Sequence, residues 1–123
     1  MRASHLALGA AGEERVARHL AQRGWRILAR NARAGGVEID LVIARGGVVA
    51  FVEVKTRRGR GHGAPEEAVD ARKRARLVRA AAAWLRENRP RAGRVRFDVA
   101  VCEPDAAGGW QVRHLEGAFD AGD

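Results

Sequence analysis

The sequence is poor in the residues that build disulfide frameworks, zinc sites and membrane spans. Cys102 is its single cysteine, so no disulfide can form within the chain. Its four histidines are scattered and show no zinc-ligand spacing. Charged residues interrupt every long apolar run, and the apolar start of the chain runs into Glu13 and Glu14, as a helix does and a signal peptide does not. These absences predict a cytoplasmic protein that does not enter a membrane.

Positive charge is what the chain has in excess. It carries 23 basic and 15 acidic side chains, which gives a net charge of +8. Such a balance favours a polyanionic partner, of which nucleic acid is the commonest, although a basic protein need not have one. The 123 residues are 46% hydrophobic and 31% charged, as in a globular protein. No repeat or long linker divides them, so we expect one domain over residues 1–123, with a frayed acidic tail at about 116–123.

Two β-rich runs flank Gly46 and Gly47, which is a strong hairpin signal. If the two glycines form the turn, Asp40 lies opposite Glu53 and Glu38 lies opposite Lys55. Side chains alternate between the faces of a strand, so these charged residues share one face. The opposite face is expected to be wholly apolar, and it comprises Val37, Ile39, Leu41, Ile43, Ala50, Val52 and Val54.

This gathering of carboxylates suggests a bound cation. Directly opposed residues have Cβ atoms roughly 5 Å apart, and two carboxylates at that distance repel by about 3 kcal/mol at an effective dielectric constant of about 20. A divalent ion would turn the repulsion into attraction, and oxygen ligands without thiolates suit Mg²⁺ or Mn²⁺. The alternative is a solvated end of the hairpin, at which Lys55 neutralises Glu38 and Asp40.

The same residues resemble a known nuclease signature. Asp40 followed by Glu53-Val54-Lys55 is similar to the D…(D/E)-x-K motif of restriction-endonuclease-like nucleases. Further motifs occur in the order of one branch: Gly-Ala-Ala-Gly-Glu at 9–13, Gly-Trp at 24–25, Arg-Asn at 30–31, Glu-Ile-Asp-Leu at 38–41, Phe-Val-Glu-Val-Lys-Thr-Arg at 51–57, Gly63, Lys73 and Arg-Phe-Asp at 96–98. The ordered set, which covers nearly the whole chain, resembles the bacterial YraN-type family of predicted endonucleases, related to archaeal Holliday junction resolvases. One departure is Val37, which stands where that family usually has a glycine.

The resemblance implies a restriction-endonuclease-like fold, in which a mixed sheet with a central hairpin is flanked by helices. It implies metal-dependent hydrolysis of phosphodiester bonds in DNA, including structured or branched DNA. Asp40 and Glu53 would hold Mg²⁺ or Mn²⁺ with the backbone carbonyl of Val54, and Lys55 would orient the attacking water. Glu13 would complete the metal site, although the residue pattern alone favours a glutamate placed for the helix dipole. Glu38 is a reserve ligand.

Two other functions stay open at this point. One is a non-hydrolytic nucleic-acid-binding module on the same fold, for which opposed acids would have no use. The other is a partner-binding subunit or homodimer, suggested by the apolar surface of the second predicted helix.

Two basic features lie near the acidic residues. The loop at 56–63 is rich in glycine and arginine, and we expect Arg57, Arg58 and Arg60 to contact a phosphate backbone, although basic loops are usually only solvated. Lys73 is expected to contact phosphate or to form a structural salt bridge. Lys55 and Lys73 are the only lysines among the 23 basic residues, which marks them as positions that require a compact ammonium group.

The order of the expected elements predicts an α/β domain. Helices are expected over residues 9–23 and 65–88, and strands over 25–29, 95–101 and 110–115 in addition to the hairpin, with a loop at 31–36. Glu13 lies on the inner stripe of the first helix with Val16, Ala17 and Leu20. In the second helix, Ala71, Ala75, Val78, Ala82 and Leu85 are expected to face the core, and Arg72, Arg76, Arg79 and Arg86 to face solvent. Asp98 is expected to be a structural acceptor, and Trp84, Trp110 and Phe119 to be core or interface residues.

Overall fold

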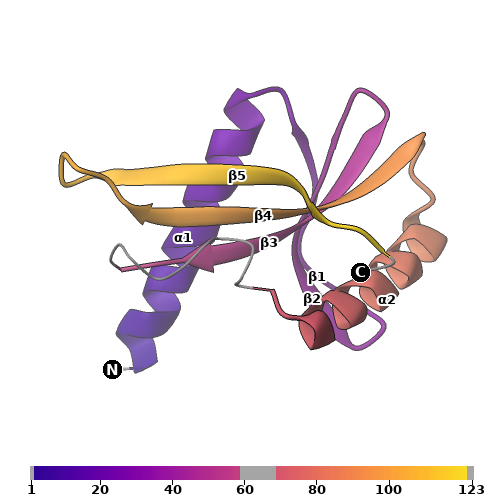
Figure 1. Cartoon of the computed structure of the whole chain (residues 1–123), viewed down its shortest axis with the longest axis horizontal. Helices are drawn as coiled ribbons and strands as arrows, with labels where there is room; N and C mark the ends of the chain where they lie inside the picture. The colour runs from indigo at the N-terminus through magenta and orange to yellow at the C-terminus, as the bar shows by residue number, and fades with distance from the viewer. Residues whose placement is uncertain (1, 59–68, 122–123) are drawn as a thin grey trace.

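A computed structural model describes residues 2–58 and 69–121 as two helices and five strands (Figure 1). In chain order the elements are α1 (Arg2–Gln22), β1 (Arg26–Ala34), β2 (Val37–Arg45), β3 (Val48–Thr56), α2 (Ala71–Asn88), β4 (Arg94–Pro104) and β5 (Trp110–Phe119). The strands form one sheet in the order β1-β2-β3-β4-β5, in which only β3 and β4 are parallel. Parallel neighbours need a crossover connection, and α2 lies in it. The predicted α/β class is confirmed, with a mixed sheet and a central hairpin flanked by helices.

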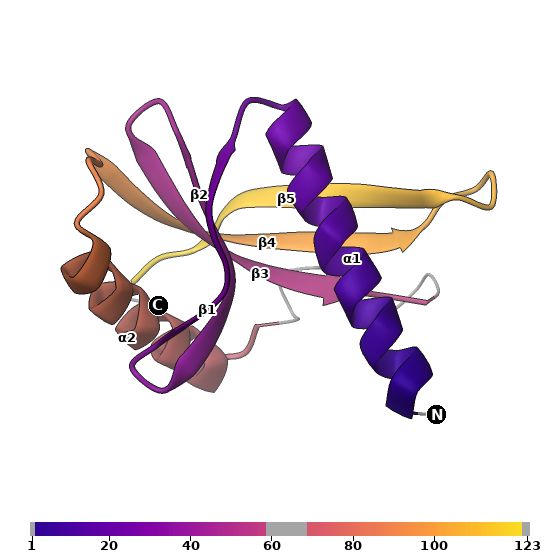
Figure 2. The ribbon, with the colours of Figure 1, turned by 180° about the vertical axis from the view of Figure 1, so that it is seen from behind.

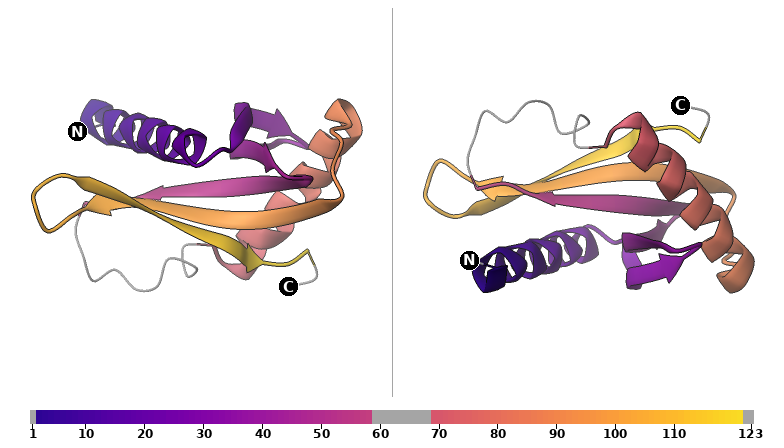
Figure 3. Two further views of the ribbon diagram at one scale, coloured as in Figure 1. Left: turned by 90° about the horizontal axis from the view of Figure 1, so that it is seen from above. Right: turned by 90° about the horizontal axis from the view of Figure 1, so that it is seen from below.

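The two helices cover opposite faces of the sheet (Figures 2 and 3). On one face, Val16, Ala17 and Leu20 of α1 are buried in a core cluster that includes Leu41 and Val52. On the other face, α2 packs in a second cluster that includes three phenylalanines, Phe51, Phe97 and Phe119. Neither described helix is long and apolar enough to cross a membrane.

The β1–β2 and β2–β3 hairpins turn on pairs of glycines. Gly46 and Gly47 have φ angles of 56° and 81°, and the β2–β3 register pairs Arg45 with Val48 as predicted. Positive φ at both central turn positions matches the twist of the flanking strands and suits glycine. Gly35 and Gly36, with φ angles of 59° and 77°, make a second such turn between β1 and β2. The prediction of a loop at 31–36 is therefore wrong, because residues 31–34 continue β1.

The expected alternation along β2 fails at its first half. Leu41 and Ile43 pack in the cluster under α1, as one face of a strand requires, but Ile39 packs in the cluster under α2. Val37 also packs against the α2 cluster. The two faces exchange around Asp40, where the pairing of β2 with β3 has ended after Leu41 and Val52. β2 is thus free to follow β1 rather than the plane of β3.

The second helix is shorter than predicted and buries a different stripe. It begins at Ala71, where Asp70 caps it by accepting a hydrogen bond from the Lys73 amide; the expected start at 65–68 lies outside the described residues. Its buried residues are Leu77, Ala80, Ala81, Ala83 and Trp84, whereas the expected core residues Ala71, Ala75 and Ala82 are exposed. An alanine can face either way at little cost, so Leu77 and Trp84 decide the orientation. Lys73 lies one turn before Leu77 and thereby reaches the sheet.

The last two strands are longer than predicted. β5 continues to Phe119, which is buried, so the frayed tail expected at about 116–123 is shorter than the sequence suggested. Trp84 and Phe119 are core residues, and Trp110 is half-buried and packs against the cluster under α1. Asp98 is fully buried on the α1 face of β4.

Candidate metal centre where β2 leaves β3

Asp40 stands at the point where two neighbouring strands separate. The pairing of β2 with β3 ends at Leu41 and Val52, after which β2 follows β1 and β3 follows β4. Figure 2 shows the β1–β2 hairpin turning away from β3 beyond this point. The Val54 amide donates a hydrogen bond to Asp40 Oδ2 at 2.8 Å, so the carboxylate holds the two strands together where their ladder stops. This bond fixes the position of the Asp40 side chain.

Three carboxylates meet at this opening. Ligand oxygens of Glu13, Glu38 and Asp40 all lie within 4.8 Å of one another. Glu13 comes from α1 and the other two come from β2, so residues far apart in the sequence form the cluster. Glu13 and Asp40 are half-buried, and Glu38 is exposed. The prediction treated Glu38 only as a reserve ligand, but the structure places it among the three.

Glu53 lies beside this cluster and is held by α2. Lys73 Nζ forms an ion pair with Glu53 Oε2, and the Glu53 side chain is 11% exposed. Lys73 belongs to α2, which packs on the face of the sheet opposite to α1. Of the two roles expected of Lys73, the salt bridge is present in the structure. This salt bridge neutralises Glu53, so Lys73 influences the charge of the acidic site.

Burial and mutual repulsion raise the pKa values of Asp40 and Glu13. Burial, followed by the charge of Glu53, raises the pKa of Asp40 to about 7, although the Val54 amide and Lys73 act in the opposite direction. Burial also raises the pKa of Glu13; a hydrogen bond with Asn31 acts in the opposite direction, and the charges of Glu38 and Glu53 raise it further. A cation in the cluster would displace the Asp40 proton and offset the repulsion between the carboxylates.

The cluster opens into a small cavity of about 180 Å³. Glu13 and Asp40 contribute to its wall with Asn31 and Arg30, and Arg30 is engaged by Glu14 at 2.6 Å. The space accommodates an ion with several water molecules. The ligand atoms offered are all carboxylate oxygens, which suits Mg²⁺ or Mn²⁺ and does not suit a thiolate-preferring metal. The residues present therefore fit the metal that the sequence predicted.

Asn31 also belongs to the site, although the sequence predicted that it would lie in a loop. It lies within β1 with a φ of 49°, and its side chain hydrogen-bonds Glu13. Asparagine tolerates this left-handed conformation better than other residues with a side chain. The Arg-Asn motif at 30–31 was a usable signal, but only the pairing of β1 with β2 brings Asn31 to the acidic cluster.

Gly12 allows α1 to dock close to the end of β3. A Cβ atom at this position would lie 1.9 Å from Thr56 Oγ1 and 3.0 Å from Thr56 Cβ. No side chain other than hydrogen fits there without displacement of Thr56 or of the helix. The close approach positions the next residue, Glu13, against β2.

The predicted basic contacts have mixed outcomes. Lys55 is exposed directly after Val54, and Arg58 is exposed. Arg57 is only 7% exposed and its amide bonds the carbonyl of Cys102, so its side chain is not open to a phosphate backbone as predicted. Its position explains the difference, because Arg57 directly follows the last residue of β3 and its amide adds one more hydrogen bond to β4. Arg60 lies outside the described residues.

Asp98 is a structural acceptor, as predicted, and lies apart from the acidic cluster. Arg96 donates two hydrogen bonds to its carboxylate at 2.8 and 2.9 Å, and the Gly117 amide donates a third at 2.9 Å. His114 Nε2 lies 2.6 Å from Asp98 Oδ2. Burial alone would raise the pKa of Asp98, but these partners together hold it below its usual range. The network ties β5 to β4.

Comparisons with known proteins agree with the motif-based resemblance. The family described as "Uncharacterised protein family UPF0102" matches residues 12–102. A UPF0102 protein of Symbiobacterium thermophilum is 46% identical over 114 residues, which is 93% of this chain and 97% of that protein. A UPF0102 protein of Rhodococcus opacus is 45% identical over 117 residues, which is 95% of this chain and 99% of that protein.

Among solved structures, the chain is similar to Pyrococcus furiosus SfsA in complex with Ca²⁺. The TM-score is 0.43 and the sequence identity 17%. The match covers 91% of this chain and 63% of SfsA, so the chain spans less than two thirds of that protein.

Proposed function

The chain belongs to the UPF0102 family, the YraN-type family that its motifs predicted, and we propose that it is a metal-dependent endonuclease that hydrolyses phosphodiester bonds in DNA. The carboxylate cluster of Glu13, Glu38 and Asp40 carries this proposal. A purely structural site would gain nothing from three neighbouring carboxylates, of which Glu13 and Asp40 have raised pKa values in a half-buried opening. The proposal treats residues 1–123 as a single catalytic domain located in the cytoplasm.

The residues of the cluster divide the work of such a site. Glu13, Glu38 and Asp40 would hold Mg²⁺ or Mn²⁺, and Glu53 with the carbonyl of Val54 would complete the set of ligands. When bound, the ion supplies Lewis acidity at the phosphoryl group. The Val54 amide fixes the Asp40 carboxylate, and Asn31 orients Glu13.

The two lysines suit the remaining tasks. Lys55, which is exposed beside Val54, would orient the attacking water and stabilise negative charge that develops on the phosphoryl oxygens. Lys73 neutralises Glu53 in the metal-free protein and could exchange this partner for a phosphate. That the only two lysines of the chain both adjoin the acidic residues supports the interpretation that these positions require an ammonium group rather than a guanidinium group.

A cleavage assay tests the proposal. The protein would be incubated with Mg²⁺ or Mn²⁺ and labelled duplex, single-stranded, flap and four-way DNA, in parallel with Asp40→Asn and Glu87→Gln. Glu87 is an exposed residue of α2 and serves as a charge-matched control. Cleavage that requires the metal, is lost in Asp40→Asn and persists in Glu87→Gln is the expected result. Binding of these substrates without any cleavage would favour the non-hydrolytic module instead.

A further inference from the structure

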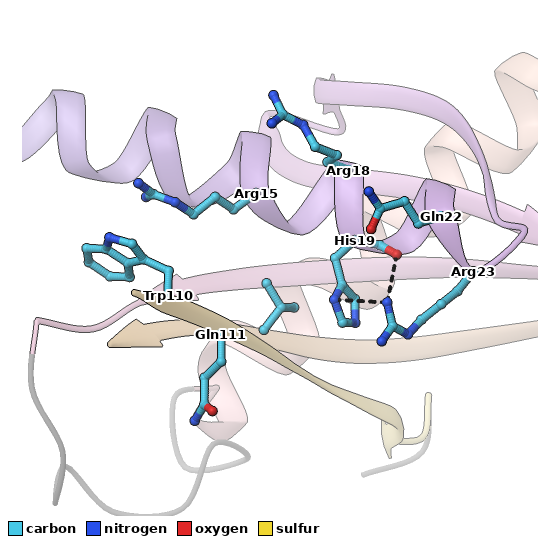
Figure 4. A pocket seen from close by; sticks show the side chains of 8 residues that line it. Arg15, Arg18, His19, Gln22, Arg23, Trp110 and Gln111 are labelled. Atoms are coloured by element: carbon cyan, nitrogen blue, oxygen red, sulfur yellow. Dashed lines mark hydrogen bonds between the residues drawn. The ribbon is translucent and has the colours of Figure 1, made fainter. Parts of the chain in front are cut away.

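A second cleft lies on the other flank of α1, between this helix and β5. Its volume is about 590 Å³, and its lining includes Arg15, Arg18, His19, Arg23, Trp110 and Gln111 (Figure 4). Glu13 faces β2 on one side of the helix, whereas these residues face β5 on the other. None of the described residues that line the cleft is acidic.

The positive charges of this cleft are only weakly compensated. Arg18 reaches Glu14 at 3.5 Å, in a pair whose side chains are 69% and 49% exposed. Arg23 Nη1 donates to His19 Nδ1 at 3.2 Å, which requires an unprotonated acceptor; burial, followed by the charges of Arg23 and His114, lowers the pKa of His19. Arg15 Nη1 is buried and has no hydrogen-bond partner among the described residues. Arg18 and Arg23 are exposed and offer their guanidinium groups to an anion, whereas Arg15 also interacts with Cys102.

An aromatic ring lies beside these charges. Trp25 and Trp84 are buried in the core, but Trp110 at the start of β5 is only half-buried. The Arg15 guanidinium carbon lies 4.5 Å from the centroid of the Trp110 ring, and Figure 4 shows both side chains at the same end of the cleft. Tryptophan and arginine planes are the groups on which unstacked nucleobases pack.

We infer that the cleft between α1 and β5 binds a single-stranded segment of nucleic acid. Arg18 and Arg23 take phosphates, and one unstacked base packs on Trp110 beside Arg15. Arg15 and Arg23 are eight residue steps apart, which is about 12 Å at the rise of an α-helix. One strand of a duplex carries a phosphate for every 3.4 Å or so (about one base step) of its axis, so the arginines can reach more than one phosphate. A duplex keeps its bases stacked and would leave the tryptophan unused, so a single strand or a frayed end fits better.

This inference rests on the proposed function only for the class of ligand. Binding in the cleft requires neither a metal nor hydrolysis, and it would select substrates that present a single-stranded arm to the nuclease. It can therefore be tested in EDTA, where the carboxylate cluster has no metal.

The first test measures the affinity for a short labelled single-stranded oligonucleotide by fluorescence anisotropy in EDTA. Arg18→Gln/Arg23→Gln should weaken binding at least about tenfold and should reduce the slope of log K against log salt by about 1.4, as two lost phosphate contacts require. The control Arg72→Gln/Arg76→Gln removes the same charge from an exposed face of α2 and should have a smaller effect. Equal losses in the two double variants would overturn the inference.

The second test uses the fluorescence of Trp110. The oligonucleotide should quench the fluorescence of the wild-type protein, and Trp110→Phe should abolish the quenching while it retains binding. Trp110→Ala should lower the affinity at least about fivefold. Quenching that survives in Trp110→Phe would overturn the inference.

The two proposals can fail separately. If the cleft variants bind the oligonucleotide unaltered and metal-dependent cleavage is intact, only the inference about the cleft is refuted. If the cleft variants lose oligonucleotide binding as expected but the wild-type protein cuts no substrate, only the proposed nuclease activity is refuted.

Discussion

At the scale of single residues, Asp40 has both a structural role and a place in the candidate metal site. Its carboxylate accepts the Val54 amide where the β2–β3 ladder ends, and it also belongs to the acidic cluster. The first role fixes the carboxylate in a half-buried place, and the burial raises its pKa to about 7. The metal-free site is thus destabilised by the same placement that prepares it for a cation.

This placement predicts how stability changes with pH. In the unfolded chain Asp40 loses its proton near pH 3.9, whereas in the folded protein it keeps the proton to about pH 7. Asp40 therefore stabilises the metal-free fold most below about pH 4, and this contribution is lost as the pH rises to about 7. Asp40→Asn should raise the free energy of unfolding at about pH 8 and flatten its fall between about pH 4 and 7. Urea denaturation in EDTA from about pH 4 to 8 measures both, and a variant that is less stable at about pH 8 with an unaltered slope would refute the interpretation.

Asp98 should behave in the opposite way. Its pKa is held low by His114, Arg96 and the Gly117 amide, so its stabilisation is present at neutral pH and is lost as the pH falls through its low folded-state pKa. Asp98→Asn leaves Arg96 without its buried anionic partner and should cost about 3–5 kcal/mol. Asp105→Asn, in an exposed turn where an amide oxygen can still accept the Ala107 and Gly109 amides, serves as the control. Equal stability losses in the two variants would show that the Asp98 network contributes little.

Lys55 is expected to require its ammonium group. Lys55→Arg should keep the fold and the affinity for nucleic acid but reduce cleavage by a factor of about 100 or more, as Lys55→Ala would, because a guanidinium group is broader and cannot approach water and phosphate as a point charge. Single-turnover cleavage with Mn²⁺ measures the loss. A Lys55→Arg variant that cleaves at the wild-type rate would reduce Lys55 to an electrostatic anchor.

At the scale of the elements, the docking of α1 depends on Gly12. Gly12→Ala would place a methyl group against Thr56 and should cost about 1–3 kcal/mol through overpacking while it moves Glu13 away from the cluster. Gly9→Ala is a matched control in the same helix, since a Cβ there meets nothing within 4 Å, and it should stabilise the fold by about 0.5–1 kcal/mol. Thermal unfolding compares the two variants. Similar stabilisation by both would show that the close approach is unimportant.

The elements differ in how well the sequence predicted them. The β2–β3 register was predicted correctly from Arg45–Val48 to Leu41–Val52, because Gly46 and Gly47 fix a turn and the turn fixes the register. The predicted pairs Asp40–Glu53 and Glu38–Lys55 do not form, because the ladder ends before them. The buried stripe of α2 was predicted wrongly, because its many alanines made two helical faces almost equally apolar. The exchange of faces at Ile39 could not be predicted from β2 alone, since it follows from the end of the pairing with β3.

At the scale of the whole molecule, the fold separates the charges that the sequence mixes. Carboxylates gather where α1 meets β2, and arginines gather where α1 meets β5. Asp40, Glu53 and Lys55 could be proposed from one hairpin because they are close in sequence. The contacts of Glu13 with β2, of Lys73 with Glu53 and of Arg15 with Trp110 join distant segments, so no local pattern reveals them. The homodimer expected from the apolar surface of α2 stays a prediction, which light scattering would test.

Calorimetric titration with Mn²⁺ at about pH 7 tests most directly whether the acidic cluster is a metal site. Asp40 is partly protonated at this pH, so binding should release protons, and the measured heat should depend on the ionisation enthalpy of the buffer. The release should vanish at about pH 8.5, and Asp40→Asn should abolish binding while Glu87→Gln leaves it intact. Unchanged Mn²⁺ affinity in Asp40→Asn, or binding at pH 7 without proton release, would contradict the assignment of the metal to this cluster.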